Sequence, residues 1–199
     1  VSVLPGKGSV VGDALVRHPL VKRIAFTGGT NVGMGIQRLA ADKLMPTSLE
    51  LGGKSPTIVC ADADLDHAVA GVIYGIFSSS GESCIAGSRA FVHASVYDEF
   101  KSRLLAAVKG LRVADPSLES THMGPLVNRG HRDSVERYVQ IGRDEGGQIL
   151  CGGARPQGGY YEQGSYYLPT VIEGLPNTAR MCREEIFGPV LALLPWSDE

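Results

Sequence analysis

One stretch of the chain combines a cysteine with small residues and glycines in a pattern suited to nucleophilic chemistry. Residues 77–89 read Phe-Ser-Ser-Ser-Gly-Glu-Ser-Cys-Ile-Ala-Gly-Ser-Arg, with Cys84 near the centre. Small neighbours leave space for a substrate to reach the sulfur, and Gly81 and Gly87 permit a backbone that presents N–H groups to a developing negative charge. Such a cysteine can act as a nucleophile when its thiolate is available. The common alternative is a buried structural cysteine, because free cysteines are among the most buried residues.

Two further patterns are weak when each is taken alone. Glu50 is flanked by leucines and followed by two glycines; it is either a half-exposed strand residue or a general base in apolar surroundings. A glycine turn at 28–33 enters a helix, whose free N–H groups could receive a phosphate. The turn is not a P-loop, because Met34 stands where a P-loop requires lysine. A plain tight turn explains it equally well.

The elements that must position these residues are expected to alternate between strands and helices. We predict strands at 1–4, 23–27, 48–51, 56–60, 90–93, 148–151, 166–172 and up to about 196, and helices at 10–16, 33–44, 65–77, 96–111 and 128–145. This order indicates an α/β fold with parallel strands and right-handed crossovers. The stretch 152–165 is expected to be a surface connection. The glycines at 52 and 53 are expected to mark a domain boundary, giving domains 1–51 and 52–199.

Composition excludes several classes of protein. The 199 residues are 43% hydrophobic with a net charge of −2, which allows a sizeable core and provides no basic stripe for nucleic acid. No apolar run approaches membrane-spanning length, and the first five residues lack the regions of a signal peptide. The four cysteines are widely spaced without a C-x-x-C pair, so we expect no metal site and a reducing, cytoplasmic location.

Four motifs, taken together and in order, resemble the aldehyde dehydrogenase superfamily. They are Phe26–Gly33, Leu49–Pro56, Gly81–Arg89 and Glu184–Val190. The resemblance implies an aldehyde-dehydrogenase-like α/β fold. In that fold, residues 1–51 would end a Rossmann-type cofactor-binding domain, and residues 52–199 would form the α/β catalytic domain that carries the cysteine.

The resemblance also implies a reaction, the oxidation of an aldehyde to a carboxylic acid with NAD or NADP. Cys84 would attack the aldehyde as a thiolate, hydride transfer would leave a thioester, and Glu50 would activate the water that hydrolyses it. The backbone N–H of Cys84 would supply half of an oxyanion hole. Glu185 would hold the nicotinamide ribose and Phe187 would pack at the nicotinamide end. The cofactor-binding residues implied in full are Thr27, Gly28, Gly29, Val32, Gly33, Leu51, Glu185 and Phe187.

Two positions depart from the family pattern. Gly29 stands where serine is usual, which leaves only a backbone N–H for the pyrophosphate. Glu82 stands where glutamine is common, and we expect its carboxylate to point away from the sulfur of Cys84. The chain covers only the middle of the family's usual length, so the 199 residues alone are expected to be inactive. The parent protein is expected to be a homodimer or homotetramer.

Three alternatives differ in the residues that they require. CoA-acylating relatives commonly lack a glutamate at the position of Glu50, so its presence favours hydrolysis. A non-catalytic relative would be marked by loss of Cys84 or Glu50. A cysteine hydrolase needs a histidine paired with the thiol, and none of the five histidines lies in a pattern that indicates one. The identity of the aldehyde, and the choice between NAD and NADP, are left open by these residues.

Overall fold

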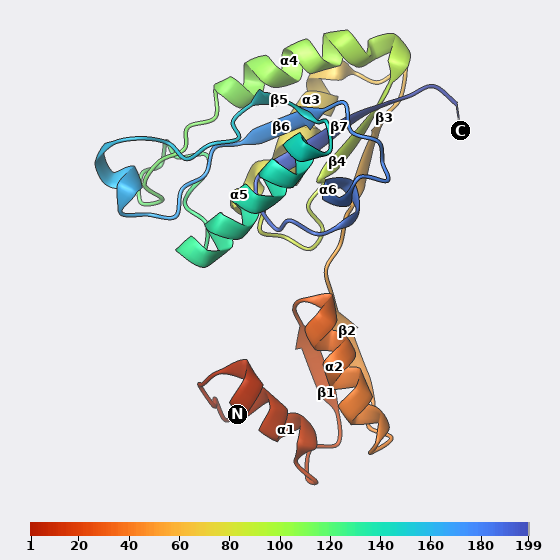
Figure 1. Cartoon of the computed structure of the whole chain (residues 1–199), viewed down its shortest axis with the longest axis vertical. Helices are drawn as coiled ribbons and strands as arrows, with labels where there is room; N and C mark the ends of the chain where they lie inside the picture. Colours follow the sequence, from red (N-terminus) through yellow and green to blue (C-terminus); the bar gives the residue numbers. More distant parts are fainter. Residues whose placement is uncertain (199) are drawn as a thin grey trace. The chain divides into compact units, whose positions relative to one another are not determined.

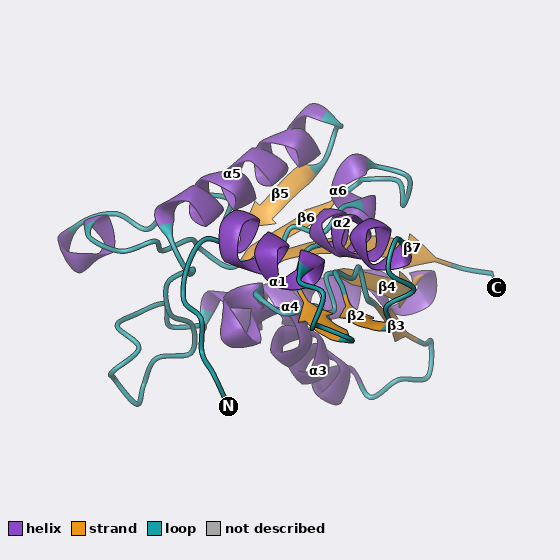
Figure 2. Ribbon diagram, turned by 90° about the horizontal axis from the view of Figure 1, so that it is seen from below, coloured by secondary structure: helices purple, strands orange, loops and turns teal. Residues whose placement is uncertain are grey.

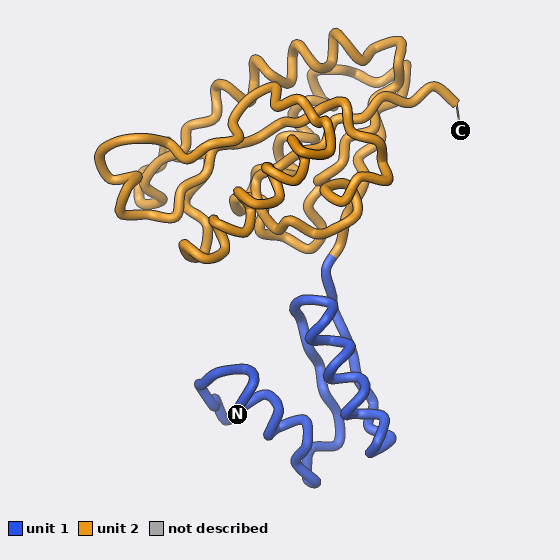
Figure 3. The backbone as a smooth tube through the Cα atoms, in the orientation of Figure 1, with its two compact units in different colours: residues 1–52 blue, residues 53–199 orange. Residues whose placement is uncertain are grey.

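The computed structural model describes residues 1–198 and divides the chain into two compact units, Val1–Gly52 and Gly53–Glu199 (Figure 1, Figure 3). The division lies at the glycine pair where the sequence predicts a domain boundary. None of the described helices has the length and hydrophobicity that crossing a bilayer requires.

The first unit is a small α/β arrangement. Its elements are the π-helical turn η1 (Gly8–Gly12), α1 (Asp13–Arg17), β1 (Ile24–Thr27), α2 (Thr30–Ala41) and β2 (Thr47–Glu50). The two strands are parallel, with Thr27 opposite Glu50 at their carboxyl ends. Val16, Ala40 and Met45 form the buried core between the helices and this sheet. The unit therefore presents one strand–turn–helix–strand crossover, in which the glycine turn joins β1 to α2.

The strand predicted at residues 1–4 is wrong. These residues are exposed and form no strand, and the sheet of the first unit consists of β1 and β2. An apolar stretch becomes a buried strand only where another strand and a core are available to cover it. In residues 1–52 neither lies beside this segment, so its hydrophobicity alone misled the prediction.

The second unit is built on a five-stranded sheet. The strands are β3 (Pro56–Val59), β4 (Arg89–His93), β5 (Gln148–Cys151), β6 (Thr170–Glu173) and β7 (Val190–Trp196), in the spatial order β3-β4-β7-β6-β5. All neighbours are parallel except β5, which pairs antiparallel with β6. The central β7 is buried along most of its length. The parallel pairings of this sheet and the helices between its strands confirm the expected α/β fold.

Helices cover both faces of this sheet (Figure 2). The helices are α3 (Leu65–Phe77), α4 (Tyr97–Lys109), α5 (Arg129–Asp144) and the short α6 (Arg180–Arg183), with 3₁₀ turns η2 (Ser78–Gly81), η3 (Ala94–Val96) and η4 (Gly159–Glu162). α3 and α4 share a buried cluster with Val92 and Leu193 on one face. α5 and α6 share a second cluster with Ile172 and Leu194 on the other. Successive strand residues thus feed two separate cores.

The stretch 152–165 is more than the surface connection expected from its sequence. The hydroxyl of Tyr161 donates to the Val113 carbonyl oxygen at 2.8 Å, and its ring packs edge-on against Tyr166. Tyr166 and Tyr167 are buried, and β6 begins only at Thr170. Aromatic packing therefore replaces strand pairing over the first residues of the predicted strand.

Candidate active site

The cysteine loop, defined as residues 78–88, begins where α3 ends. Asp64 caps that helix by accepting from the N–H groups of Asp66 and His67, at 3.0 and 3.1 Å. The helix leads into a turn in which Ser79, Ser80 and Gly81 all have positive φ, at 49°, 56° and 72°. A left-handed non-glycine residue costs roughly 1–2 kcal/mol, so surrounding contacts must hold this turn.

One such contact is made by Gly81 with the turn at residues 187–189. A Cβ at position 81 would lie under 3.0 Å from the backbone of Gly188 and Pro189, a separation that real Cβ atoms essentially never show. The side-chain hydroxyl of Ser80 adds a hydrogen bond to the Gly124 carbonyl oxygen at 3.1 Å. The loop is therefore fixed by close backbone approach, which only glycine at position 81 permits.

The Gly81→Ala variant is expected to unfold more easily than the wild-type chain, by about 2–4 kcal/mol, because the added methyl group meets backbone atoms in a left-handed conformation. Urea titration followed by circular dichroism measures this change. The matched control is Gly71→Ala in α3, where a Cβ has open space around it. That variant should gain about 0.5–1 kcal/mol. Equal stability of Gly81→Ala and wild type would contradict the packing described here.

Cys84 is exposed on this loop, and its surroundings hold the main chain in place. Gly53 approaches so closely that a Cβ on it would collide with the carbonyl oxygen of Cys84. Within residues 1–198 the backbone N–H of Cys84 has no hydrogen-bond acceptor. The residue thus offers an accessible sulfur beside an open N–H donor, the pair that attack on a carbonyl group requires.

The structure brings two predicted cofactor residues next to the cysteine loop. A small pocket of about 10 Å³ is lined by Gly53, by Gly81, Ser83, Ala86 and Ser88 of the loop, and by Glu185, Ile186, Phe187 and Gly188, together with Ile76. Glu185 accepts a hydrogen bond from the Gly53 N–H through Oε1 at 3.1 Å. Phe187 is exposed and has a positive φ of 57°. Residues from three segments far apart in the sequence, around Gly53, in the cysteine loop and at 185–188, therefore meet at this pocket.

The carboxylate of Glu82 is engaged at the beginning of α5. Its Oε1 accepts from the Val127 N–H at 3.1 Å and lies 3.5 Å from Nε2 of His131. These contacts hold the carboxylate at Val127 and His131; that it points away from the sulfur of Cys84 stays a prediction. The carboxylate two residues from the thiol thus has its contacts with Val127 and His131, at the start of α5.

The remaining predicted site residues lie together in the first unit, at the carboxyl ends of β1 and β2. The Gly28 N–H donates to the Glu50 carbonyl oxygen at 3.0 Å. Gly33 sits against Leu51, where a Cβ would be under 3.0 Å from that side chain. Thr27, Gly29 and Val32 belong to the same strand end and turn. Ligands of parallel α/β sheets bind at this edge, at the start of the following helix.

Glu50 itself is exposed at the end of β2. Within its own unit it therefore lacks the apolar surroundings that the sequence suggested, and its assignment as a general base stays a prediction. No group of three or more His, Cys, Asp or Glu residues that could hold a metal ion occurs in the described part of the chain.

Comparison with known proteins gives consistent results. The model of the aldehyde dehydrogenase family matches residues 1–199. The chain belongs to the aldehyde dehydrogenase family.

Individual relatives agree with this assignment. Betaine aldehyde dehydrogenase of Brucella ovis is 41% identical over 198 residues, which are 100% of this chain and 40% of the relative. An NAD⁺ complex of aldehyde dehydrogenase from Bacillus cereus superposes with a TM-score of 0.93 at 36% identity, covering 98% of this chain and 39% of that one. A double mutant of betaine aldehyde dehydrogenase from Staphylococcus aureus, with NAD⁺ and a BME-modified cysteine, superposes with a TM-score of 0.95 at 36% identity. The match covers 97% of this chain and 39% of that one. The chain thus spans about 40% of the length of these relatives.

Lys54 of this aldehyde dehydrogenase chain follows Gly53 and is unusual for a lysine. Its pKa falls from the ordinary 10.5 to about 8, chiefly because burial penalises the charged amine; the nearby Arg89 acts in the same direction, while Cys182 and Glu185 act in the opposite one. The backbone oxygen of Lys54 accepts a 3.0 Å hydrogen bond from Nε of Arg89. The guanidinium of Arg89 therefore binds the backbone of the segment that enters the second unit. The same segment carries the buried amine of Lys54.

The buried amine of Lys54 should make stability depend on pH. Its folded-state pKa lies below the unfolded value, so the protonated amine destabilises the fold below pH 8, and this cost is lost as the pH rises from 8 to 10.5. The Lys54→Met variant is expected to be more stable than wild type by about 1–3 kcal/mol at pH 7, with the difference shrinking across that window. Urea unfolding at several pH values measures it, with the exposed Lys109→Met as control. A constant difference between pH 7 and 11 would contradict this interpretation.

Proposed function

We propose that the protein carrying this chain oxidises an aldehyde to a carboxylic acid with NAD or NADP, using Cys84 as the nucleophile. One observation carries the proposal: an exposed cysteine lies on a loop fixed by the backbone of Gly53 and Gly188, beside Glu185 and Phe187. Membership of the aldehyde dehydrogenase family supports the same chemistry.

The chemistry starts with attack of the Cys84 thiolate on the aldehyde carbon, which forms a C–S bond and an oxyanion. The open N–H of Cys84 is suited to donate to that oxygen, which supports the tetrahedral thiohemiacetal. Loss of a hydride from the same carbon gives a thioester, whose sulfur is a good leaving group. Glu50 would take a proton from water, and the resulting attack releases the acid and regenerates the thiolate.

The residues present fit a dinucleotide cofactor. Gly28 and Gly29 connect the end of β1 to the first turn of the 12-residue α2, where helical N–H groups have no partner within the helix. Gly29 has open space where a side chain would stand, so a phosphate can approach its backbone. Glu185 and Phe187 line a pocket together with Ser83 of the cysteine loop, where they would be available for the nicotinamide half. Bound NAD(P)⁺ would supply the hydride acceptor.

The relatives guide the choice of substrate for a first assay. The Brucella ovis relative is named a betaine aldehyde dehydrogenase, so betaine aldehyde is included with short aliphatic and aromatic aldehydes. Glu50 favours water over CoA as the acyl acceptor. In the family, the side chains that bind the adenosine ribose and that stabilise the oxyanion lie outside the four matching motifs. We therefore expect the 199 residues alone to lack steady-state turnover. Aldehyde-dependent NADH formation by the purified chain would overturn that expectation.

Acyl transfer from p-nitrophenyl acetate tests the nucleophile without requiring the cofactor. The expected result is release of p-nitrophenolate with the acetyl group on Cys84, located by peptide mass spectrometry. Cys60 is a matched reference, because it is exposed in the same unit. The Cys60→Ser variant should react as wild type does. Acetylation that favours Cys60 or lysines over Cys84 would count against the proposal.

A further inference from the structure

His131 contacts two segments of the candidate active site through one ring nitrogen. Its Nε2 lies 2.5 Å from the Phe187 carbonyl oxygen and 3.5 Å from Oε1 of Glu82. The ring also packs edge-on against the Phe187 ring, with centroids 6.0 Å apart. Both side chains are largely buried, with 21% of His131 and 17% of Glu82 exposed. The histidine therefore stands between the cysteine loop and the turn at residues 187–189.

The chemistry of the partners determines which atom carries the proton. A carbonyl oxygen only accepts hydrogen bonds, so Nε2 of His131 must be the donor to Phe187. The same nitrogen lies 3.5 Å from Oε1 of Glu82, which is a contact at ion-pair distance and not a second hydrogen bond. Nε2 of His131 thus contacts two segments that are 105 residues apart (82 and 187) in the chain.

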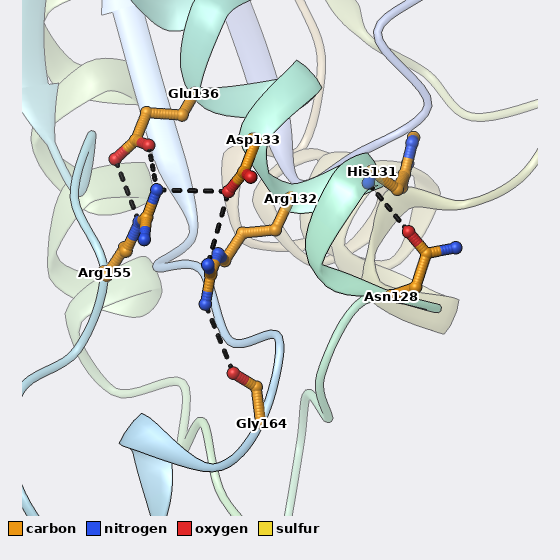
Figure 4. Close-up of polar contacts among 7 residues, drawn as sticks. All are labelled: Asn128, His131, Arg132, Asp133, Glu136, Arg155 and Gly164. Atoms are coloured by element: carbon orange, nitrogen blue, oxygen red, sulfur yellow. Dashed lines mark hydrogen bonds and ion pairs between the residues drawn. The ribbon is translucent and has the colours of Figure 1, made fainter.

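The histidine is held in place by the helix that carries it. It lies in the first turn of α5, and its backbone N–H donates to Oδ1 of the capping Asn128 at 2.9 Å (Figure 4). The same helix start supplies the Val127 N–H to Glu82. A carboxylate is favoured at a helix N-terminus. The Val127 N–H, the His131 contact and the helix dipole therefore all favour this position of the Glu82 carboxylate.

Other charged groups nearby are committed elsewhere. Arg132 donates to the Gly164 carbonyl oxygen and to Asp133, and Asp133 also accepts from Arg155 (Figure 4). On the other side, Oε1 of Glu185 accepts from Gly53. Glu82 is therefore the carboxylate that contacts His131, and no other charged pair explains the position of the ring within the described residues.

We propose that His131 is a positioning residue that fixes the Phe187 turn against the cysteine loop through its Nε2–H. Loss of this donor would leave the strained, positive-φ Phe187 without the bond to its carbonyl oxygen, and Glu82 with only the Val127 contact. Cys84 and the Phe187 turn would then move more independently. The inference gives a role to the site of the proposed function, but the contacts themselves do not depend on aldehyde oxidation.

Hydrogen–deuterium exchange of the purified chain tests the tie without aldehyde or cofactor. In His131→Ala, amide exchange in both segments 81–88 and 184–190 is expected to accelerate about fivefold, the effect of one lost hydrogen bond. The ratio of iodoacetamide labelling at Cys84 to that at Cys60 should change by about threefold or more. His131→Gln keeps a side-chain N–H donor and should recover most of both effects.

The control is His122→Ala, which also removes one histidine hydrogen bond from the same unit, since Nδ1 of His122 accepts from the Arg112 N–H at 2.8 Å. It should leave both segments and the labelling ratio unchanged. Equal effects of the two variants, or an unchanged ratio in His131→Ala, would overturn the proposal. If His131→Ala does not fold, a ¹H–¹⁵N spectrum of the wild-type histidines decides: neutral His131 must carry its proton on Nε2, and a proton on Nδ1 alone overturns the tie.

Because no aldehyde is present, this experiment separates the two proposals. A tie confirmed by exchange while Cys84 resists acyl transfer would remove the proposed function and leave the positioning role. Acyl transfer to Cys84 without an exchange effect of His131→Ala would support Cys84 as the nucleophile and exclude the positioning role of His131.

Discussion

Replacing Cys84 by serine is expected to lower aldehyde-dependent NAD(P)H formation in the active protein by at least about 10⁴-fold. A serine hydroxyl is not ionised near neutral pH, so it is a far weaker nucleophile than a thiolate. An alkoxide is also a poorer leaving group than a thiolate, so both formation and breakdown of the acyl intermediate suffer. The geometry that supports this expectation is the exposed Cys84 on a fixed loop, with a backbone N–H that has no acceptor within residues 1–198.

The measurement is the rise in absorbance of the reduced nicotinamide at saturating aldehyde. The Cys60→Ser variant serves as control, because it removes another exposed thiol from the same unit and should keep its full rate. Circular dichroism checks that both variants fold. A Cys84→Ser protein that retained more than a hundredth of the rate would exclude this cysteine as the nucleophile.

The second large effect is expected for Glu50→Gln, which should trap the acyl group on Cys84. Glutamine cannot take a proton from water, so thioester hydrolysis should slow by about 10²–10⁴-fold while acyl transfer to the sulfur continues. With p-nitrophenyl acetate, this predicts one rapid equivalent of p-nitrophenolate followed by almost no further release. Glu50 is exposed within its own unit, so its role as the general base stays a prediction. This experiment tests that role.

The persistence of acetyl-Cys84, followed by intact-protein mass spectrometry, measures this hydrolysis directly. Asp42→Asn is a suitable control, since it also removes an exposed carboxylate from the first unit and should not change the lifetime. Equal lifetimes in wild type and Glu50→Gln would show that another group activates the water.

Much of the fold could be predicted from periodicity and from punctuation by glycine, proline and capping residues. α3 was expected at 65–77 and occupies Leu65–Phe77, because Asp64 caps it and its apolar residues recur at helical spacing. The segment 1–4 failed for the opposite reason: its apolar residues have no neighbouring strand in the first unit. Periodicity describes a segment's own faces, whereas burial depends on partners that the segment does not contain.

The site divides in the same way. Cys84, Glu185 and Phe187 are recognisable because they belong to two short contiguous motifs, and the structure brings the cysteine loop and residues 185–188 together in the second unit. His131 left no such signal, since its contacts with Glu82 and Phe187 connect distant parts of the chain. The buried amine of Lys54 was equally invisible, because its environment is made by β4, α6 and the turn after it. Residues that position others are found only when the packing is known.

The most direct test of the central claim is competition between an aldehyde and iodoacetamide at Cys84. Thiohemiacetal formation occupies the sulfur, so labelling of Cys84 in the purified chain should slow as the aldehyde concentration rises, while labelling of Cys60 should not change. The account predicts that Cys84 is labelled ahead of the other cysteines and is the cysteine that aldehyde protects. Protection of Cys60 and Cys84 to the same extent, or of neither, would contradict it.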